Sequence, residues 1–349
     1  MAEKKQSTRL GYEDLRKLKE LAQLAPCYLL CGDEDYLKEN ALAQLKKLAL
    51  SGGDETFNYH RLDGPNVDLD ELSDAVEAFP SFAEKSFVEV RDFDLYKVKE
   101  DDGSAPKLLR LLSDLPETCC LVFYYATIPF TEDRRKKKLN EAVKSAVNVV
   151  QIDKQSESAL LNWISRRFAA HGQTISRDDA EYLILISGGL MTGLISEIEK
   201  ISAYAKEKAV TRADIDAVAV PVAEAQVFKL SDAIAGKRFD EAASLMATLL
   251  QMDEHPLMIL GLIGSQCRRL YLAKLLAEQG AKEGKLMNVF GFRSEYPARL
   301  LLNNARRFSR RWCEEAVLAC GEADFRMKNS PADPEDVLRS LFLKLAGER

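Results

Sequence analysis

The sequence has no long apolar run: no stretch approaches the about 18 consecutive uncharged apolar residues that indicate a membrane-spanning helix. The opening residues MAEKKQSTRL also lack the apolar segment of a secretory signal peptide. We therefore expect a cytoplasmic protein without a membrane partner. With 349 residues, 46% hydrophobic and 30% charged, the chain is long enough for two or three globular domains.

Excess positive charge is absent as well. The formal net charge is −6 and the pI is near 5.4. Non-specific affinity for DNA comes mainly from Lys and Arg that neutralise phosphates, so this balance argues against a free-standing, strongly basic DNA-binding module. Local basic patches remain compatible with it.

Clusters of metal-ligating residues are missing too. His60, His171 and His255 are far apart, and none stands with Cys or Asp at the spacing of metal ligands. The seven cysteines are odd in number and mostly set in apolar patterns, which predicts buried, reduced thiols. We expect no metal, no cofactor and no catalytic residue. The cysteines are Cys27, Cys31, Cys119, Cys120, Cys267, Cys313 and Cys320.

Short apolar runs alternate with helix-period segments in the first part of the chain. The apolar runs predict strands at 27–31, 57–62, 87–90, 120–125 and 147–152. A short leading helix is expected within residues 1–20, and further helices near 38–48, 69–79, 105–113 and 134–146. This alternation indicates a parallel sheet covered on both faces. We predict a doubly wound α/β domain over residues 1–153, with ligands beyond the carboxyl ends of the strands.

Only helices are predicted after Asp153. Apolar stripes at helical spacing, with Ser176 and Thr211 as N-caps, predict a small helical domain over residues 154–220. Residues 218–222 contain a proline and are interpreted as a linker.

The remainder, residues 221–349, is predicted to be a larger helical bundle. Pro256 opens a long helix, and Asp333 with Pro334 supplies the N-cap and first-turn proline of a final helix. The predicted fold class is therefore α/β followed by all-α.

Gly32 and Lys38 stand at the spacing of a phosphate-binding loop, just after the first predicted strand. A working GxxxxGK[ST] loop wraps backbone N–H groups around a phosphate with two glycines and holds magnesium with a hydroxyl. Here Leu37 replaces the second glycine, Glu39 replaces the hydroxyl, and three acidic side chains oppose a triphosphate. The pattern predicts a nucleotide-binding scaffold that has lost its nucleotide. The alternative is coincidence, with Asp33 serving as an N-cap.

Asp92 and Asp94 follow the third predicted strand, roughly where a Walker B segment holds magnesium. Without the glycine and hydroxyl in the loop, a metal there would have no triphosphate to bridge. We interpret both as surface acids.

Five segments resemble the bacterial DNA polymerase III delta subunit family. The members of this family are clamp-loader subunits of the AAA+ type. They occur in the family's order between about residue 20 and the C-terminus: YLLCGDEDYLKENAL (28–42), FNYHRLDG (57–64), DRRKKKL (133–139), VFKLSDAI (227–234) and EADFRMK (322–328). The resemblance implies an AAA+-like α/β domain, a small helical lid and a C-terminal helical collar.

What the resemblance implies for function is a non-catalytic subunit of the DNA polymerase III holoenzyme. Such a subunit binds the beta sliding clamp and helps to open one interface, so that the ring can be placed on primed DNA during replication. The implied partners in the complex are the ATP-binding tau/gamma loader subunits and the delta-prime subunit. The family members of this type do not bind ATP, which agrees with the substitutions at Leu37 and Glu39.

The clamp-binding element of the family lies before the third strand and carries an apolar pair that ends in Phe. Phe82 matches that aromatic residue, while Ser81 departs from the apolar partner. Either Phe79 fills the partner's role or the contact is weaker. The alternative is that these phenylalanines cover the core of the sheet.

Two basic clusters leave alternatives open. The run 134–138 suits DNA phosphates or an acidic neighbouring subunit, or forms a solvated face. Arginines around Phe308 and Trp312 suit single-stranded nucleic acid, or pack within the collar. The candidate DNA contacts are Arg134, Arg135, Lys136, Arg306, Arg307 and Arg310.

Two other functions compete with the clamp-loader role. An active P-loop ATPase would use Lys38 in an atypical loop and would bind ATP with magnesium. A DNA-binding regulator would use the helical domains and would show salt-sensitive DNA affinity.

Overall fold

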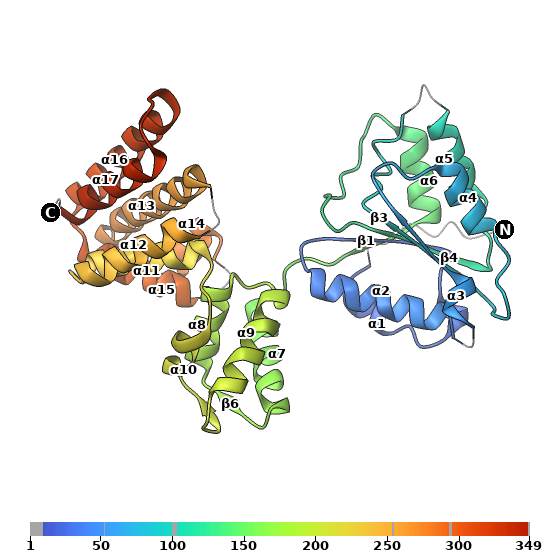
Figure 1. Ribbon diagram of the computed structural model, residues 1–349, viewed down its shortest axis with the longest axis horizontal. Coiled ribbons are helices and arrows are strands. Elements are labelled where there is room, and N and C mark those ends of the chain that lie inside the picture. The colour runs from blue at the N-terminus through green and yellow to red at the C-terminus, as the bar shows by residue number, and fades with distance from the viewer. Residues whose placement is uncertain (1–9, 52, 100–102, 253–254, 293–294, 348–349) are drawn as a thin grey trace. The chain divides into compact units, whose positions relative to one another are not determined.

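The computed structural model describes residues 10–51, 53–99, 103–252, 255–292 and 295–347. The chain divides into two compact units, the first ending at Lys154 and the second beginning at Gln155 (Figure 1). We describe each unit by itself. The further division of the second half at residue 220 stays a prediction.

A five-stranded parallel sheet forms the centre of the first unit, in the order β2-β3-β4-β1-β5. β1 and β4 are buried along their whole length, which explains their continuous apolar sequences. The strands are β1 (Cys27–Cys31), β2 (Tyr59–Asp63), β3 (Ser86–Arg91), β4 (Cys119–Tyr124) and β5 (Asn148–Gln151).

Helices cover both faces of this sheet (Figure 1). Side chains alternate along each strand, so Cys27, Leu29 and Cys31 share one face, where they join the apolar side chains of α4, α5 and α6. The longest helix of the unit, α2, packs on the opposite face. The helices are α1 (Tyr12–Arg16), the 3₁₀ turn η1 (Leu21–Gln23), α2 (Asp35–Ala49), α3 (Glu55–Asn58), α4 (Leu69–Glu77), α5 (Ser104–Ser113) and α6 (Lys137–Ala146).

The second unit is helical apart from one pair of two-residue strands. Its large apolar core lies in the C-terminal part, around α13. The first part contains α7 (Glu157–Ala170), β6 (Thr174–Ile175), α8 (Arg177–Ser187), α9 (Met191–Tyr204), β7 (Ala209–Val210) and α10 (Arg212–Val218). The rest contains α11 (Ala223–Ala235), α12 (Phe239–Gln251), α13 (Pro256–Glu278), α14 (Glu283–Phe290), α15 (Glu295–Arg307), α16 (Arg310–Asn329) and α17 (Pro334–Gly347).

The predicted fold class, α/β followed by all-α, is confirmed. The predicted helix starts in the second unit are confirmed as well. Ser176 accepts a hydrogen bond from the Asp179 N–H and Thr211 accepts one from the Asp214 N–H, as N-caps do. Pro256 opens a 23-residue helix. The seven cysteines are buried, and none of them forms a disulfide bond.

Three local predictions were wrong. Phe57 does not begin a strand, because residues up to Asn58 form the short helix α3. The run of cations does not start a helix at 134, since α6 begins only at Lys137. Asp33 is not an N-cap: α2 begins at Asp35, two residues later.

Neither a membrane-spanning helix nor a metal-ligand cluster occurs among the described residues. None of the helices there is both long and apolar enough to cross a membrane. Within the same residues, no group of His, Cys, Asp and Glu side chains is arranged to hold a metal ion.

Candidate functional site: an exposed aromatic loop and a closed phosphate-binding loop

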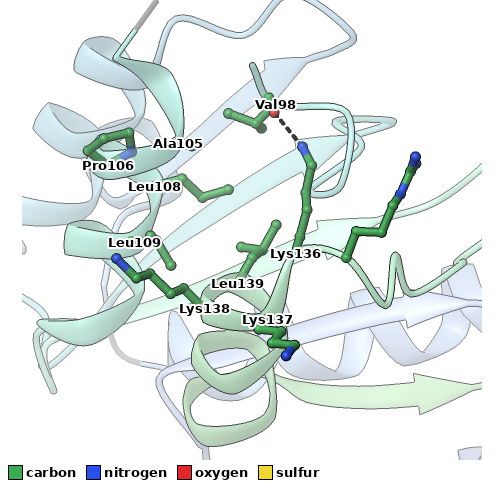
Figure 2. Close-up of a pocket in the computed structure, with 10 residues that line it drawn as sticks. Val98, Ala105, Pro106, Leu108, Leu109, Lys136, Lys137, Lys138 and Leu139 are labelled. Carbon is green, nitrogen blue, oxygen red and sulfur yellow. Dashed lines mark hydrogen bonds between the residues drawn. The ribbon is translucent and has the colours of Figure 1, made fainter. Parts of the chain in front are cut away.

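The basic segment before α6 borders a pocket of about 440 Å³ (Figure 2). Leu108 and Leu109 of α5 face Leu139 of α6 across its apolar side. Lys136 extends toward the loop before α5, where its Nζ donates a hydrogen bond of 2.7 Å to the carbonyl of Val98. This lysine therefore ties two parts of the domain together.

The other cations of this segment are more exposed. Arg135 forms an ion pair of 3.0 Å with Asp133. The guanidinium lowers the pKa of the Asp133 carboxyl, with help from the Arg135 backbone N–H. Arg134 is exposed, and no ion pair joins it to another described residue. Arg135 and Lys136 are thus each held by a partner within the protein, whereas no ion pair to a described residue holds Arg134.

The loop after β1 is closed by the chain's own backbone. Gly32 has a φ of 112°, and a Cβ there would lie 2.3 Å from the carbonyl oxygen of Ile152. Glycine is therefore required for the approach of residue 152. The Glu34 N–H also donates to the Ile152 carbonyl, at 3.1 Å. The backbone N–H of Glu34, of the kind that a working loop would donate to a phosphate, is therefore already hydrogen-bonded within the protein.

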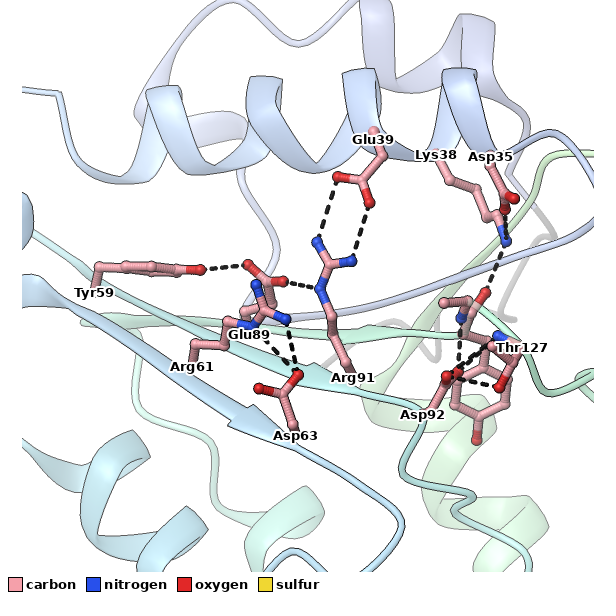
Figure 3. A network of polar contacts seen from close by, with 12 residues as sticks. Asp35, Lys38, Glu39, Tyr59, Arg61, Asp63, Glu89, Arg91, Asp92 and Thr127 are labelled. Carbon is pink, nitrogen blue, oxygen red and sulfur yellow. Dashed lines mark hydrogen bonds and ion pairs between the residues drawn. The ribbon is translucent and has the colours of Figure 1, made fainter. Parts of the chain in front are cut away.

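Lys38 is also occupied, although it stands where a phosphate-binding lysine would. Its side chain is 1% exposed, and its Nζ lies 2.8 Å from the carbonyl oxygen of Tyr125 and 2.8 Å from the carboxylate of Asp35 (Figure 3). Asp35 thus supplies the negative charge that a phosphate would supply. Leu37 is buried as well. The lysine holds the first turn of α2 to the end of β4.

Glu39, which replaces the magnesium-holding hydroxyl, belongs to a chain of ionic contacts (Figure 3). Arg91 at the end of β3 pairs with Glu39 at 3.0 Å and with the buried Glu89. Glu89 also accepts a hydrogen bond of 2.7 Å from the Tyr59 hydroxyl. Burial and this carboxylate together raise the pKa of Tyr59 to about 12. The carboxylate of Glu39 therefore has a cationic partner inside the protein.

Asp92, at the Walker B position, caps backbone N–H groups. Its carboxylate accepts hydrogen bonds from the Ala126 N–H at 2.7 Å and from the Thr127 N–H and hydroxyl at 3.0 and 2.8 Å. Partial burial raises the pKa of Asp92, but the hydrogen bonds from Thr127 and Ala126 outweigh burial and place that pKa below its usual value. Asp94 accepts from the Tyr96 N–H. Both acids act within the fold, and neither is simply a surface residue as predicted.

The loop between α4 and β3 exposes two phenylalanines. The Phe79 side chain is 89% exposed and that of Phe82 is 99% exposed. Phe82 also has a φ of 53°, in the left-handed region that costs a residue with a Cβ about 1–2 kcal/mol. The alternative that these rings cover the core of the sheet is therefore wrong. Both rings are available to a partner.

Ser81, between the two rings, is fixed by a residue that sequence reasoning missed. The Ser81 N–H donates to Asn58 Oδ1 at 2.6 Å, and Asn58 Nδ2 donates to the Ser81 carbonyl at 2.9 Å. Asn58 is fully buried. The only sequence signal was a polar residue within an expected strand. The backbone of Ser81 therefore holds the loop in place through Asn58. Its side chain is polar and does not provide an apolar contact to a partner.

The arginines of the second predicted basic cluster lie around a buried aromatic pair. Phe308 and Trp312 stack with ring centroids 3.8 Å apart, and the indole N–H donates to the Leu345 carbonyl at 3.1 Å. Both rings are buried, so neither offers a face to a nucleic-acid base. Arg307 pairs with Asp232 and Arg310 with Glu314, each at 3.0 or 3.1 Å. Helix packing explains this cluster, and DNA contact by the exposed Arg306 and its neighbours stays a prediction.

These features define a nucleotide-binding-like α/β scaffold with an internally occupied phosphate loop, followed by a helical unit. Two family models match this chain: "DNA polymerase III, delta subunit" over residues 28–153 and "DNA polymerase III delta subunit, C-terminal domain" over residues 224–345. Together these segments cover more than half of the sequence. The chain belongs to the DNA polymerase III delta subunit family.

Individual relatives agree with this assignment. The chain is 23% identical to the DNA polymerase III subunit delta of Bacillus subtilis, over 95% of this chain and 96% of that protein. It is 26% identical to the probable DNA polymerase III subunit delta of Aquifex aeolicus, over 77% and 76%. The solved structure of the Bacillus subtilis DNA clamp loader delta protein matches 97% of this chain and 98% of its own, with 21% identity and a TM-score of 0.53. This likeness confirms the fold.

Proposed function

We propose that this protein is a clamp-loader subunit that binds the beta sliding clamp and helps to open the ring for loading on primed DNA. The observation that carries the proposal is the loop with Phe79 and Phe82, whose rings are 89% and 99% exposed. Aromatic side chains that enter a pocket on a partner often dominate the energy of an interface. Family membership makes the sliding clamp the partner to test first.

Binding of the purified chain to its own bacterium's sliding clamp, measured by calorimetry, tests this proposal. We expect Phe82→Ala to lose about 2 kcal/mol or more of binding free energy, and Phe79→Ala to lose less. Tyr204→Ala is a matched control, because Tyr204 is an exposed aromatic residue in the second unit to which no contact is assigned. A parent chain that does not bind the clamp would contradict the proposed function. If Phe82→Ala binds the clamp as tightly as the parent does, Phe82 is not the anchor and another residue must supply the contact.

We also propose that the chain neither binds nor hydrolyses ATP. The support is local: Gly32 is in contact with Ile152, Lys38 is neutralised by Asp35, and Glu39 is paired with Arg91. An active ATPase would need all three groups to be released. Titration with a fluorescent ATP analogue and magnesium is expected to show no saturable binding, and saturable binding that Lys38→Met removes would contradict this proposal.

The collar role rests on an exposed apolar face of α16. Leu318 and Phe325 are 67% and 68% exposed, and their spacing of seven residues places them on the same side of the helix. We propose that this face contacts the tau/gamma or delta-prime subunits in an assembly located in the cytoplasm. Contact of Arg134 with primed DNA within that assembly belongs to the same proposal.

A further inference from the structure

The aromatic loop has a neighbour at the same edge of the sheet. β2 and β3 are adjacent parallel strands, and Tyr59 at the start of β2 is paired with Phe87 near the start of β3. The segments that precede these strands therefore lie at the same, amino-terminal edge of the sheet. The loop 78–85 precedes β3, and α3 precedes β2. The closed phosphate loop follows β1 and lies at the opposite edge.

Asn58, the last residue of α3, connects the two segments. Its side-chain amide donates to the Asp54 carbonyl at 2.8 Å as well as to the Ser81 carbonyl. It also accepts the Ser81 N–H. A backbone position that is held from both its N–H and its C=O has little freedom to move. α3 and the middle of the loop are thus joined by hydrogen bonds inside the protein.

A second contact joins the segments on the other side of Phe82. Gly53, in the turn before α3, is so close to Ala83 that a Cβ at Gly53 would lie 2.5 Å from the Ala83 Cβ. The turn is itself ordered by Asp54, whose side chain accepts the Thr56 N–H at 2.8 Å. The residues on both sides of Phe82 therefore contact α3 or the turn that precedes it. This support explains how Phe82 can keep a strained backbone.

Phe57 adds a third exposed ring to this edge. Its side chain is 64% exposed, and it precedes Asn58 directly. Five phenylalanines of the described residues are prominently exposed, and three of them are Phe57, Phe79 and Phe82. A concentration of exposed rings on segments that are hydrogen-bonded together indicates an interaction surface.

We propose that α3 and the loop 78–85 form one docking surface, in which Phe57 is a third aromatic anchor and Asn58 is a positioning residue for Phe82. The occupant is the sliding clamp, so this inference rests on the proposed function. The surface suits an apolar groove on the clamp that accommodates the side chains of Phe57, Phe79 and Phe82. If the contact consisted of two residues only, Phe79 and Phe82 alone would be involved.

The first test compares clamp affinity for the parent, Phe82→Ala, Phe57→Ala and the control Tyr204→Ala, at an exposed aromatic residue of the second unit. We expect Phe57→Ala to bind about fivefold more weakly than the parent, and Tyr204→Ala to bind as the parent does. If Phe82→Ala binds weakly and Phe57→Ala equals the parent, the enlarged surface is wrong and the proposed function stands. If the parent does not bind the clamp, both fail.

The second test separates positioning by Asn58 from general stability. We expect Asn58→Ala, and the milder Asn58→Ser, to weaken clamp binding by about tenfold in the parent, because the loop loses its anchor. In a chain that already carries Phe82→Ala, the same changes are expected to weaken binding by less than about twofold, since Asn58 acts through Phe82. Equal losses in both backgrounds would overturn the positioning role.

Discussion

The backbone conformation of Phe82 can be tested apart from its ring. The ring is 99% exposed and contributes almost no burial, while its left-handed φ of 53° suits glycine better than any residue with a Cβ. We predict that Phe82→Gly has a free energy of unfolding about 1 kcal/mol higher than Phe82→Ala, and that both lose clamp binding. Urea denaturation measures the difference.

Phe79 provides the control for this prediction, because it is also highly exposed but has no positive φ. There the order should reverse, with Phe79→Gly less stable than Phe79→Ala, since glycine increases the entropy of the unfolded chain. Equal stability of the two Phe82 variants would mean that the loop carries no such strain in solution.

The lowered pKa of Asp92 leads us to predict that the free energy of unfolding depends on pH. Its pKa is lowered in the folded protein by hydrogen bonds from Thr127 and Ala126. An Asp with a lowered pKa stabilises the fold above its unfolded-state pKa of about 3.9, and the contribution is lost as the pH falls through the folded-state pKa. We predict that Asp92→Asn is about 1 kcal/mol less stable than the parent at pH 7. The difference should narrow below about pH 4.

Denaturation series at several pH values check this prediction. Asp94→Asn is the matched control, because Asp94 accepts one backbone N–H that an amide oxygen can accept equally well. A stability difference between parent and Asp92→Asn that stays constant down to pH 2 would rule out the ionised carboxylate as its source.

Residue by residue, the sequence showed which positions of the phosphate loop were altered but not what fills it. Leu37 and Glu39 stand where a working loop has its second glycine and its hydroxyl, so the proposal that the nucleotide site is lost could be made from spacing alone. The partners of Lys38 and Gly32, by contrast, are the carbonyls of Tyr125 and Ile152. Lys38 and Tyr125 are 87 positions apart in the chain. Contacts between such distant residues are not encoded in any local sequence pattern.

At the scale of elements, the exposed side of α16 gives a separate prediction. Leu318 and Phe325 are on one face of this helix, while its buried residues pack on α13. We predict that Leu318→Ser with Phe325→Ser weakens co-assembly with the tau/gamma and delta-prime subunits by at least about tenfold, with a small change in thermal stability. Analytical size exclusion of the mixed subunits measures co-assembly.

Lys328→Ser is a suitable control for the α16 prediction, since Lys328 lies on the same helix and is also exposed. It should leave co-assembly unchanged. Normal assembly of the Leu318 and Phe325 double variant would show that the collar uses other helix faces.

Elements with a strong apolar period were predictable, and those formed by polar contacts were not. β1 and α13 follow continuous or periodic apolar patterns and begin where the sequence indicates. α3 has only four residues, begins at an Asp54 cap and ends at Asn58, whose partner is 23 positions away in the chain. The apolar Phe57 therefore suggested a strand, although it is an exposed residue of a helical turn.

For the whole molecule, the two proposed contacts lie in different compact units. Phe82 belongs to the first unit, which ends at Lys154, and Phe325 to the second. The resemblance to a three-domain family suggests that clamp binding and assembly use different parts of the chain. The amino-acid composition alone does not assign either activity to a particular unit. Residues without shared contacts contribute additively to free energies, so the two activities should be separable.

We therefore predict that a chain carrying both Phe82→Ala and Phe325→Ser shows the clamp affinity of Phe82→Ala and the assembly defect of Phe325→Ser. Each value should agree with its single variant within about 0.5 kcal/mol. Calorimetry with the clamp and co-assembly with the loader subunits, both on the isolated double variant, provide the two readings. A larger coupling would mean that occupation of one surface alters the other, because additivity fails only where two sites share contacts or a common conformational change.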